Sequence, residues 1–541
     1  MHKACLCLLL ASGFSAHAAG APQWSVQDLA FQASKDYGNP YLEAALTAEF
    51  SGPSGARVEV KGFWDGGRTF KVRWTPALPG KWAYVTRSAD PGLNGKRGEV
   101  HATPPDPGQH GCLRRDVEYP YSFVFDDGAR CFLFGNTYYA LTSNAMAGDR
   151  WKAAVDNTRA KGMNKIRFSL YRGPGDRHRT GFGFSPAFVE EDFDRPNLPH
   201  WRKLDEVVRY LASRGIIADI ILFQREDVDR VSREQSERYL RYAIARYAAF
   251  PNVIWCLQNE WEYTKKPKEL WNAMGELASR EDPWARRGEY VRGLSVHQQT
   301  RYDFQLFGAK WFSHAIVQLG VRNRGKAHRG GDEWSLAGRD LKSVFRNGDD
   351  WGNFSILYNW GHNVPVVNDE YGYIGEPADE TEPRGPGGGT VRYSRDKHRR
   401  TMWGIYVAGG YGSAGDKNEY DDGRPYVSAN WHDEPEFDDI KRLVDFFTAK
   451  GFEYWKMAGH NELVKTGERV YVLAEPGRQY IVYAAAGGRF SIDLAAGGYE
   501  ARRFDPRTGE DLALDRVSGP AIRSFSAPDN RDWVLHLRMV K

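Results

Sequence analysis

Two hydrophobic runs of this chain each end in an acidic residue with aromatic neighbours. The run NVIWCLQNEWE (252–262) places Glu260 at such an end, and VPVVNDEYGYIGE (364–376) places Glu370 at another. Because eight-stranded α/β barrels carry their catalytic groups at the carboxyl ends of their strands, we predict that the two glutamates share one barrel mouth. Two carboxylates placed in this way can break a glycosidic bond: one protonates the departing oxygen while the other attacks or assists.

Each of these strand ends carries a second polar residue. Asn259 and Glu260 are adjacent, and adjacent strand residues face opposite sides, so both reach the mouth only if the strand bulges or ends there. Glu260 can instead be a carboxylate that favours a helix start. At the other end Asp369 precedes Glu370. We favour Glu370, because its longer side chain on the last strand residue is better suited to cross the mouth, and Asp369 stays the alternative.

Further polar and aromatic residues lie near predicted strand ends, where groups that bind sugar hydroxyls are expected to collect. Each polar residue can equally be a hydrogen-bonded residue of a loop, and each aromatic residue can be core packing. The predicted polar set is Asn136, Tyr138, Gln224, His297 and Asp416, and the predicted sugar platforms are Trp261 and Tyr371.

The segments that would position these residues alternate between strand-like and helix-like patterns from residue 112 to residue 460. Eight nearly apolar runs are separated by amphipathic segments, which predicts a (β/α)8 TIM barrel with a parallel sheet. An open doubly wound sheet is the structural rival. The eight runs are CFLFGNTYYAL, GMNKIRFSLY, GIIADIILF, NVIWCLQNE, YVRGLSVHQ, AIVQLGV, VPVVNDE and GGYGSAG.

Short alternating runs bounded by Gly, Pro and Asp flank the barrel on both sides. Residues 20–107 are predicted to form an N-terminal β-sandwich, followed by a linker rich in proline and glycine. Residues 461–541 are predicted to form a second sandwich of short strands, among them FSIDLAA and YEARRFD. The fold class is therefore α/β, a TIM barrel flanked by two β-sandwich domains. A loop at 376–389, rich in glycine and proline, is either a lid or a surface excursion.

Residues 1–19 have a short basic start, an apolar run and a small-residue cleavage site, which predicts a signal peptide and a periplasmic or secreted location. Three cysteines remain after its removal. Cys112 and Cys131 can form a disulfide in an oxidising compartment or stay reduced. Cys256 lies in an apolar run and is predicted to be a small buried residue.

The composition argues against several other classes of protein. The net charge is only +4 over 541 residues and basic pairs are scattered among acids, so no nucleic-acid partner is predicted. No later stretch has the roughly 18 consecutive apolar residues of a membrane span. Zinc-helix, nucleophile-elbow and phosphate-loop motifs are missing, which predicts neither a cofactor nor a metal. The sequence leaves the oligomeric state undetermined.

The overall pattern resembles the clan of retaining (β/α)8 glycoside hydrolases and, more narrowly, their apiosidase-like family. The flanks resemble an N-terminal sandwich domain of unknown function and a C-terminal module named for collagen binding. The matching barrel stretches are LFGNTYYAL, KGMNKIRFSLY, LDEVVRYLASRGIIADIILF, NVIWCLQNE, LSVHQ, VPVVNDEYGY and MWGIYVAGGYGSAGD. The matching flanks are GFWDGGRTFKVRWTPALPGKWAYVT, YEARRFDPRTGE and DWVLHL.

The resemblance implies a glycoside hydrolase that acts on a poly- or oligosaccharide. Glu260 would be the general acid and then base, and Glu370 the nucleophile of a retaining double displacement. Asn259 would hydrogen-bond the sugar 2-hydroxyl, and Arg167 would orient the nucleophile. Two alternatives stay open: a carbohydrate-binding or adhesion protein without catalysis, and an inverting hydrolase that uses Asp369 as its base.

Overall fold

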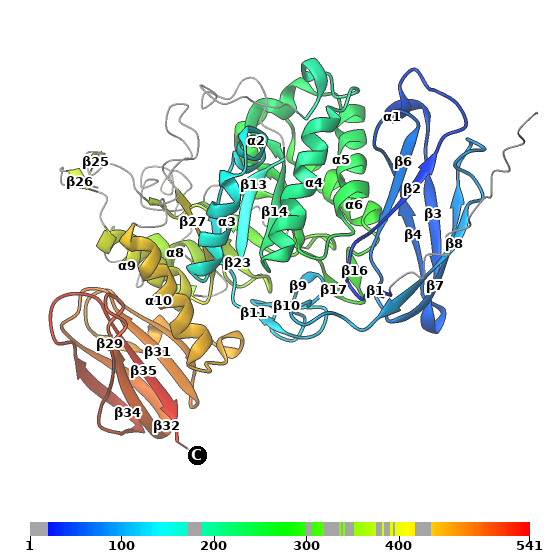
Figure 1. The fold of residues 1–541 in the computed structure, drawn as a ribbon. Coiled ribbons are helices and arrows are strands. Elements are labelled where there is room, and N and C mark those ends of the chain that lie inside the picture. The colour runs from blue at the N-terminus through cyan, green and yellow to red at the C-terminus, as the bar shows by residue number, and fades with distance from the viewer. Residues whose placement is uncertain are drawn as a thin grey trace, which may run out of the picture.

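Eight parallel strands form a nearly closed barrel at the centre of the molecule, with a β-sandwich on either side (Figure 1). The structure is a computed structural model. It describes residues 20–170, 187–298, 308–318, 351–374, 395–416 and 434–540, together with Leu306 and the short pieces 335–336, 339–340, 381–383 and 390–392. Most of the predicted loop at 376–389 therefore lies outside the described residues.

The barrel strands follow one another around the sheet in chain order, and the last pairs with the first. Every pairing is parallel, and the fifth strand is interrupted at Val296, so that β18 and β19 together fill its place. The pairing of β27 with β12 excludes the open doubly wound sheet. The strands are β12 (Phe134–Thr137), β13 (Lys165–Ser169), β14 (Ile217–Gln224), β15 (Val253–Asn259), β18 (Leu294–Ser295), β19 (His297–Gln298), β20 (Ala315–Val317), β23 (Val366–Asn368) and β27 (Tyr411–Asp416).

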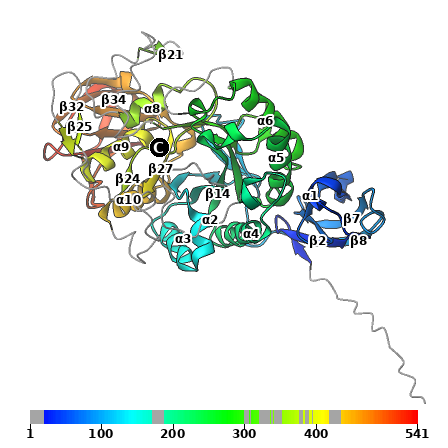
Figure 2. The same cartoon turned by 90° about the horizontal axis from the view of Figure 1, so that it is seen from above.

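The barrel strands and helices form where the sequence pattern predicts them. All residues of β14 and β15 are buried, as expected of parallel strands that are covered on both faces. Helix α5 starts with a capping box between Ser232 and Gln235. The helices are α2 (Leu141–Ala147), α3 (Arg150–Ala160), α4 (Leu198–Ser213), α5 (Arg233–Tyr247), α6 (Lys268–Glu281), α8 (Trp351–Leu357), α9 (Arg395–Val407) and α10 (Pro435–Ala449). Seen from above, they surround the strands (Figure 2).

The N-terminal sandwich consists of a five-stranded sheet and a three-stranded sheet, in the orders β1-β8-β7-β3-β4 and β2-β6-β5. A further small sheet, β11-β10-β9, lies at the amino-terminal end of the barrel strands, where the Gly293 N–H donates to the Leu113 carbonyl. The bounds are β1 (Ala21–Pro22), β2 (Gln27–Gln32), α1 (Pro40–Glu43), β3 (Thr47–Ser51), β4 (Arg57–Lys61), β5 (Phe63–Trp64), β6 (Thr69–Trp74), β7 (Gly80–Arg87), β8 (Arg97–Thr103), β9 (Leu113–Arg115), β10 (Phe123–Phe125) and β11 (Arg130–Cys131).

The C-terminal sandwich is organised around one long strand, β32 (Arg489–Phe504). We predicted two short strands here, and that prediction was wrong: FSIDLAA and YEARRFD are one strand with an irregularity between Leu494 and Gly497. Because the strand is long and locally irregular, its first part pairs with β34 and its last part with β35. The other strands are β28 (Ala458–Gly459), β29 (Val464–Thr466), β30 (Val470–Glu475), β31 (Gln479–Ala484), β33 (Asp511–Ala513), β34 (Val517–Ser526) and β35 (Trp533–Met539).

The N-terminal sandwich is attached to the barrel through a cluster of charged groups, which we call the junction cluster: Arg73, Arg246, Asp28, Asp65 and Asp205. Arg73 donates to both Asp28, at 2.7 and 3.0 Å, and Asp205, at 2.9 and 3.0 Å. Arg246 pairs with Asp205 at 2.8 Å and with Asp65 at 3.0 Å. Both guanidinium groups are buried. The cluster therefore joins strands of the sandwich to α4 and α5.

The C-terminal sandwich contacts the barrel through α9 and α10. Arg399 on α9 donates to both carboxylate oxygens of Asp532, at 2.8 and 2.7 Å. Trp403, one helical turn later, stacks on Tyr483 with ring centroids 5.6 Å apart. A bidentate ion pair and a ring stack thus hold the sandwich against the barrel helices.

The three cysteines of the described chain are buried and free. Cys112 precedes β9 and Cys131 lies on β11, and these strands flank β10 on opposite sides. Two strand spacings of about 4.8 Å separate strands arranged in this way, which exceeds the Cα distance that a disulfide spans. The structure therefore contains no Cys112–Cys131 disulfide. Within the part of the chain that is described, no helix is long and apolar enough to cross a bilayer.

Candidate active site

The carboxyl ends of β15, β20 and β23 bring Asn259, Glu260, Gln318 and Glu370 to the same end of the barrel, and the side chain of Arg167 reaches them from the middle of β13. All of the strands are parallel, so their carboxyl ends share one rim. We call these five residues the mouth cluster. Four of them are buried, and Gln318 is half-buried. The two predicted catalytic glutamates thus follow the ends of β15 and β23.

Glu260 turns the chain away from β15. The strand ends at Asn259, and Glu260 itself has a left-handed backbone with φ of 49° and ψ of 60°. This conformation is uncommon for a residue with a side chain and is often found at functional sites. Adjacent strand residues face opposite sides, so Asn259 and Glu260 can both reach the mouth only if the strand bulges or ends there. Here the strand ends, and the left-handed turn at Glu260 follows.

His297 holds this turn from the neighbouring fifth strand. The backbone N–H of Glu260 donates to His297 Nδ1 over 3.1 Å, and His297 is fully buried. An N–H group can only donate, so Nδ1 is the acceptor, and in the neutral ring the proton lies on Nε2. His297 therefore contributes to the site by fixing the backbone of Glu260.

Glu370 is held by donors on two other strands. Arg167 Nη1 donates to its Oε1 over 3.0 Å, and Gln318 Nε2 donates to its Oε2. An arginine and an amide at hydrogen-bond distance favour the ionised form of a carboxyl group. This is the state that a carboxylate nucleophile requires.

Arg167 connects the two strand ends. Besides Glu370, its Nη2 donates to Asn259 Oδ1, and its Nη1 also donates to the Tyr139 hydroxyl over 3.0 Å. The side chain is fully buried, and its hydrogen bonds reach the ends of both β15 and β23. One rigid guanidinium thus fixes the relative position of Asn259 and Glu370.

Asp369 lies inside the barrel and not at the mouth. Its Oδ1 accepts from Lys165 Nζ and, over 2.5 Å, from Ser413 Oγ, and the residue has no exposed surface. Burial raises the pKa of this carboxyl, but Lys165 and Arg167 outweigh burial and hold it below the usual value. Asp369 is therefore an ionised, enclosed group, whereas Glu370 keeps 5% of its surface exposed.

Lys165 is shared between Asp369 and a second buried acid, Asp219 on β14. The Lys165 Nζ to Asp219 Oδ2 distance is 3.0 Å. Burial raises the pKa of Asp219 despite the neighbouring Lys165, and the charge of Asp369 adds to this effect. We call Lys165, Asp219, Asp369 and Ser413 the inner cluster. Sequence reasoning missed Lys165, Asp219 and Ser413, although each is a polar residue within a barrel strand.

Two predicted binding residues, Asn136 on β12 and Tyr138 directly after it, face the outer helix α3 and not the mouth. Asn136 Nδ2 donates to the Tyr138 hydroxyl over 3.0 Å, and that hydroxyl lies 3.2 Å from Thr158 Oγ1 on the outer helix α3. Their neighbours Thr137 and Tyr139 face the barrel interior instead, where they bond the Asp369 carbonyl and Arg167. Asn136 and Tyr138 are therefore structural, because the alternation along β12 has the opposite phase to the one that we predicted.

The remaining predicted residues are placed less uniformly. Gln224 ends β14 beside Asn259 and accepts from Ser169 Oγ over 3.2 Å. Trp261 follows Glu260 and is half-buried. Tyr371 is fully buried, with its ring 5.0 Å from the His398 ring, so it is not exposed to a ligand. Asp416 ends β27 opposite Ile374, and its side chain lies outside what the structure describes.

Gln318 is a further mouth residue that sequence reasoning did not single out. It follows β20 directly, so the signal was available as a polar residue at the end of the apolar run AIVQLGV. Only its distance in space from Glu370 reveals a role. Among the described residues no group of three or more His, Cys, Asp or Glu side chains could hold a metal ion.

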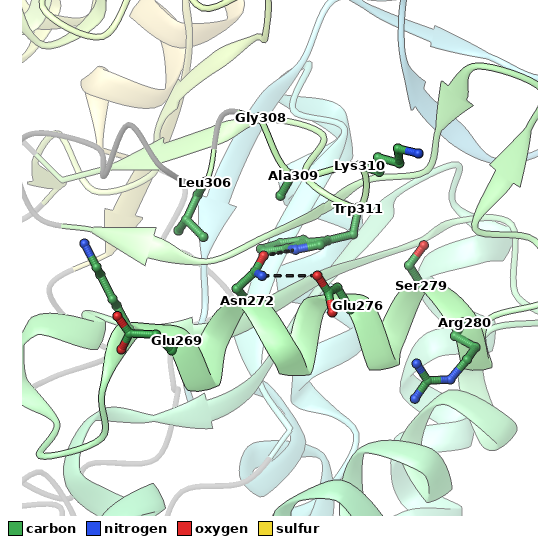
Figure 3. A pocket seen from close by; sticks show the side chains of 11 residues that line it. Glu269, Asn272, Glu276, Ser279, Arg280, Leu306, Gly308, Ala309, Lys310 and Trp311 are labelled. Carbon is green, nitrogen blue, oxygen red and sulfur yellow. Dashed lines mark hydrogen bonds between the residues drawn. The ribbon is translucent and has the colours of Figure 1, made fainter.

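A large cavity elsewhere does not coincide with the mouth. It has a volume of about 890 Å³ and lies between the outer helix α6 and a wall formed by Leu306 and residues 308–311 (Figure 3). Trp311 Nε1 donates to Asn272 Oδ1 over 2.8 Å across it, and Asn272 in turn donates to Glu276 over 3.2 Å. None of the mouth residues lines this cavity, so its size alone does not identify the site of catalysis.

Comparison with protein families matches three successive parts of the chain. The model described as "Apiosidase-like, catalytic domain" matches residues 120–437. The model "Domain of unknown function (DUF5060)" matches residues 20–89, and "Putative collagen-binding domain of a collagenase" matches residues 461–538. A search of curated proteins finds no match.

Solved structures share the architecture. A "putative glycoside hydrolase" from Bacteroides vulgatus ATCC 8482 is 22% identical with a TM-score of 0.74, covering 96% of this chain and 100% of its own. A family 5 glycoside hydrolase from the same organism is 17% identical with a TM-score of 0.61, covering 79% of this chain and 94% of its own. At these identities the likeness concerns the fold.

Proposed function

Since the chain belongs to the apiosidase-like family of glycoside hydrolases, we propose that it cleaves a poly- or oligosaccharide by a retaining double displacement. Glu370 is the nucleophile and Glu260 the general acid and base. The observation that carries the proposal is the guanidinium of Arg167, which contacts both Glu370 and Asn259. It ties the residue beside Glu260 to the nucleophile across one barrel mouth.

In the first step the Glu370 carboxylate attacks the anomeric carbon while the bond from that carbon to the leaving oxygen breaks. Glu260 gives its proton to the leaving oxygen, and an ester between the sugar and Glu370 results. Asn259 lies where its amide can contact the sugar, since its Oδ1 is held by Arg167. Arg167 keeps Glu370 ionised before the attack.

In the second step Glu260 acts as a base. It removes a proton from a water molecule, which attacks the anomeric carbon and releases Glu370 as a carboxylate. Arg167 and Gln318 already donate to the two oxygens of Glu370, so they stabilise the charge that returns to it. The configuration of the sugar is retained because it is inverted twice.

The burial of Asp369 argues against the alternative in which this residue is the base of an inverting hydrolase. A base that activates water needs access to that water, and Asp369 is fully buried and bonded to Lys165 and Ser413. The contacts of Glu370 support it over Asp369 as the working group. The mouth cluster likewise supports catalysis over an adhesion protein that only binds carbohydrate, because Arg167 and Gln318 direct donors at both oxygens of the carboxylate that would attack the sugar.

We also propose that the protein is exported. Residues 1–19 carry the pattern of a cleavable signal peptide, and they lie outside the described residues. Expression with and without this segment, followed by cell fractionation and N-terminal sequencing, tests the point. Export predicts mature protein that starts near residue 20 and is found outside the cytoplasm.

The function is tested on a panel of poly- and oligosaccharides by measuring new reducing ends, with NMR of the first-formed anomer of the product. The expected result is hydrolysis of at least one glycan with retention, lost in both Glu260→Gln and Glu370→Gln. Binding without cleavage across the panel would favour the adhesion protein. An inverted product would contradict the double displacement. Hydrolysis by Glu370→Gln at the normal rate would contradict the assignment of Glu370 as the nucleophile.

A further inference from the structure

The inner cluster sits directly beneath the mouth cluster, and one residue links the two. Asp369 precedes Glu370, and its N–H, its carbonyl and one carboxylate oxygen are hydrogen-bonded. Its N–H donates to the Val317 carbonyl over 2.9 Å, and its carbonyl accepts from Thr137 Oγ1 over 3.1 Å. Its carboxylate accepts from Lys165 and Ser413. Bonds from β12, β13, β20 and β27 therefore fix the backbone from which Glu370 projects.

The inner cluster is also in electrostatic contact with Arg167. The Arg167 Nε to Asp369 Oδ2 distance is 3.8 Å, while the other end of the same guanidinium is 3.0 Å from Glu370. Arg167 is thus located between one carboxylate inside the barrel and one at the mouth. Only a few side chains separate Asp369, Lys165 and Asp219 from Glu370. A change of charge at any of the three therefore alters the electrostatic potential at Glu370.

The sequence of β12 is adapted to this cluster at Gly135. A Cβ at this position would lie 2.3 Å from Ser413 Oγ and 2.6 Å from Lys165 Cε. The backbone of Gly135 is an ordinary strand conformation, so the glycine is required for space alone. The barrel therefore leaves out one side chain on β12 to accommodate the lysine and its serine neighbour.

The position of these charges inside the barrel is unusual. The interior of a TIM barrel is ordinarily filled with branched apolar side chains, and a buried ion pair is seldom more stable than such packing. This barrel does have an apolar part, formed by Tyr139, Ile221, Cys256 and Ile316. Burying a lysine and two aspartates beside that part lowers the free energy of unfolding. Glu370 is the neighbouring group that these charges can position.

We propose that Lys165, Asp219 and Asp369 are positioning residues that hold Arg167 and the end of β23, and thereby set the orientation and the acidity of Glu370. The inference rests on the proposed function, in which Glu370 is the nucleophile. The inner cluster does not touch the sugar. It acts through Arg167 and through the peptide that joins Asp369 to Glu370.

The charged and titratable groups around the cluster come from five barrel elements: Arg167 on β13, Asp219 on β14, Cys256 on β15, His314 just before β20, and Asp369 after β23. Burial raises the pKa of Cys256 to about 12 and lowers the pKa of His314 to about 3. Both are neutral at the pH values where a glycosidase is assayed. The charges that matter are therefore those of the lysine, the arginine and the carboxylates.

The test is the pH profile of kcat/KM in two variants that change the charge in opposite directions. Asp369→Asn removes a negative charge beside Arg167, so the acidic limb of the profile is expected to move to lower pH. Lys165→Met removes a positive charge, so the limb is expected to move to higher pH. Shifts of about 0.5 to 1 pH unit are expected for charges at this range. A merely structural role would lower the yield of folded enzyme and leave both limbs in place.

Two milder variants cover the case in which Lys165→Met does not fold. Gly135→Ala changes no charge but crowds Lys165 and Ser413, and we expect kcat to fall about tenfold with KM little changed, because misplacing a catalytic group affects the chemical step. Ser413→Ala leaves the lysine in place and is expected to lower kcat less. Normal kcat in Gly135→Ala would overturn the positioning role.

The outcomes separate this inference from the proposed function. If Glu370→Gln keeps its activity, the nucleophile assignment fails, and the inference fails with it. If Glu370→Gln is inactive while Asp369→Asn has the wild-type pH profile and kcat, the nucleophile stands and the positioning role is overturned. The positioning role is supported if the acidic limbs of Asp369→Asn and Lys165→Met shift in opposite directions while the melting temperature of the folded enzyme is unchanged.

Discussion

The barrel, taking its inner and mouth clusters together, and the junction with the N-terminal sandwich each contain two buried cations among three carboxyl groups. At the junction these are Arg73 and Arg246 with Asp28, Asp65 and Asp205. In the barrel they are Lys165 and Arg167 with Asp219, Asp369 and Glu370. The residue types are nearly the same, so composition does not tell the catalytic cluster from the structural one.

The two clusters differ in what else the arginines contact. Arg73 donates to carboxylates and to the Arg246 carbonyl, so its charge is compensated from every side. Arg167 divides its donors among one carboxylate, the Tyr139 hydroxyl and the Asn259 amide oxygen. Its carboxylate partner follows a strand end at the barrel rim. A structural cluster neutralises itself, whereas the mouth cluster leaves one carboxylate at the rim.

The largest difference is expected between two ion-paired glutamates. Glu370→Gln should lower kcat by about 10⁴-fold or more, because the nucleophile is lost. Glu281, which pairs with Lys61 at 2.5 Å and with Arg241 at 3.3 Å near the junction, is the matched control. Glu281→Gln should keep wild-type kcat. Steady-state kinetics on the hydrolysed glycan measure both, and a similar loss in the two variants would contradict the comparison.

Substitutions at Arg167 and Arg73, both buried, should fail in different ways. Arg167→Met should lower kcat/KM by about 10²- to 10³-fold and move its acidic limb to higher pH, because the cation that favours ionised Glu370 is gone. Arg73→Met should reduce the free energy of unfolding by about 3 kcal/mol, because it removes one of the two buried cations of the junction cluster and leaves Asp205 only Arg246 and Asp28 only Arg209. Its folded fraction should keep normal activity. Denaturant unfolding and steady-state kinetics on the same preparations measure both effects. A large loss of activity in folded Arg73→Met, or normal activity in Arg167→Met, would contradict the comparison.

The junction should also make stability depend on pH. Burial raises the pKa of Asp205, but Arg73 and Arg246 outweigh burial and lower it to about 2 from its ordinary value of 3.8. A lowered pKa gives stability that is complete above about pH 4 and is lost as the pH falls toward 2, about 2 kcal/mol in total. Asp205→Asn should flatten that part of the curve. If the free energy of unfolding of the variant depends on pH as in the wild type, other groups cause the acid sensitivity.

The smallest effect is expected at the turn after β15. His297→Ala removes the acceptor for the Glu260 N–H and should lower kcat/KM about tenfold, since an unpaired buried N–H costs about 1–3 kcal/mol. His297→Asn offers an amide oxygen and should retain more activity than the alanine variant. An equal loss in both variants would mean that the ring is needed for more than accepting this bond.

The fold and the two catalytic candidates were open to sequence reasoning because their signal is local. Continuous apolar runs predict strands that are covered on both faces, and a polar residue directly after such a run lies at the rim of the barrel. This found Glu260, Glu370 and Asn259, whereas Arg167, which lies inside β13, came from the resemblance to the family. It did not find Lys165, Asp219 or Ser413, because a polar residue inside a strand can face either side.

The β12 strand shows where sequence reasoning reaches its limit. The run FGNTYY alternates, and alternation says that Asn136 and Tyr138 share one face while Thr137 and Tyr139 share the other. It does not say which face is inside. The structure turns Thr137 and Tyr139 inward, so our prediction for this strand was shifted by one residue. The merging of two predicted strands into β32 is a similar case, since pairing partners decided it.

By itself, the amino-acid sequence determined which segments become strands, in what order they follow, and which carboxylates stand at their ends, because these depend on neighbours along the chain. Tertiary structure decided which of Asp369 and Glu370 meets the mouth, and that Arg167 joins Glu370 to Asn259. The reason is that a strand fixes the spacing of its side chains but not their phase. Closure of the sheet into a barrel sets the phase by pairing each strand with two others.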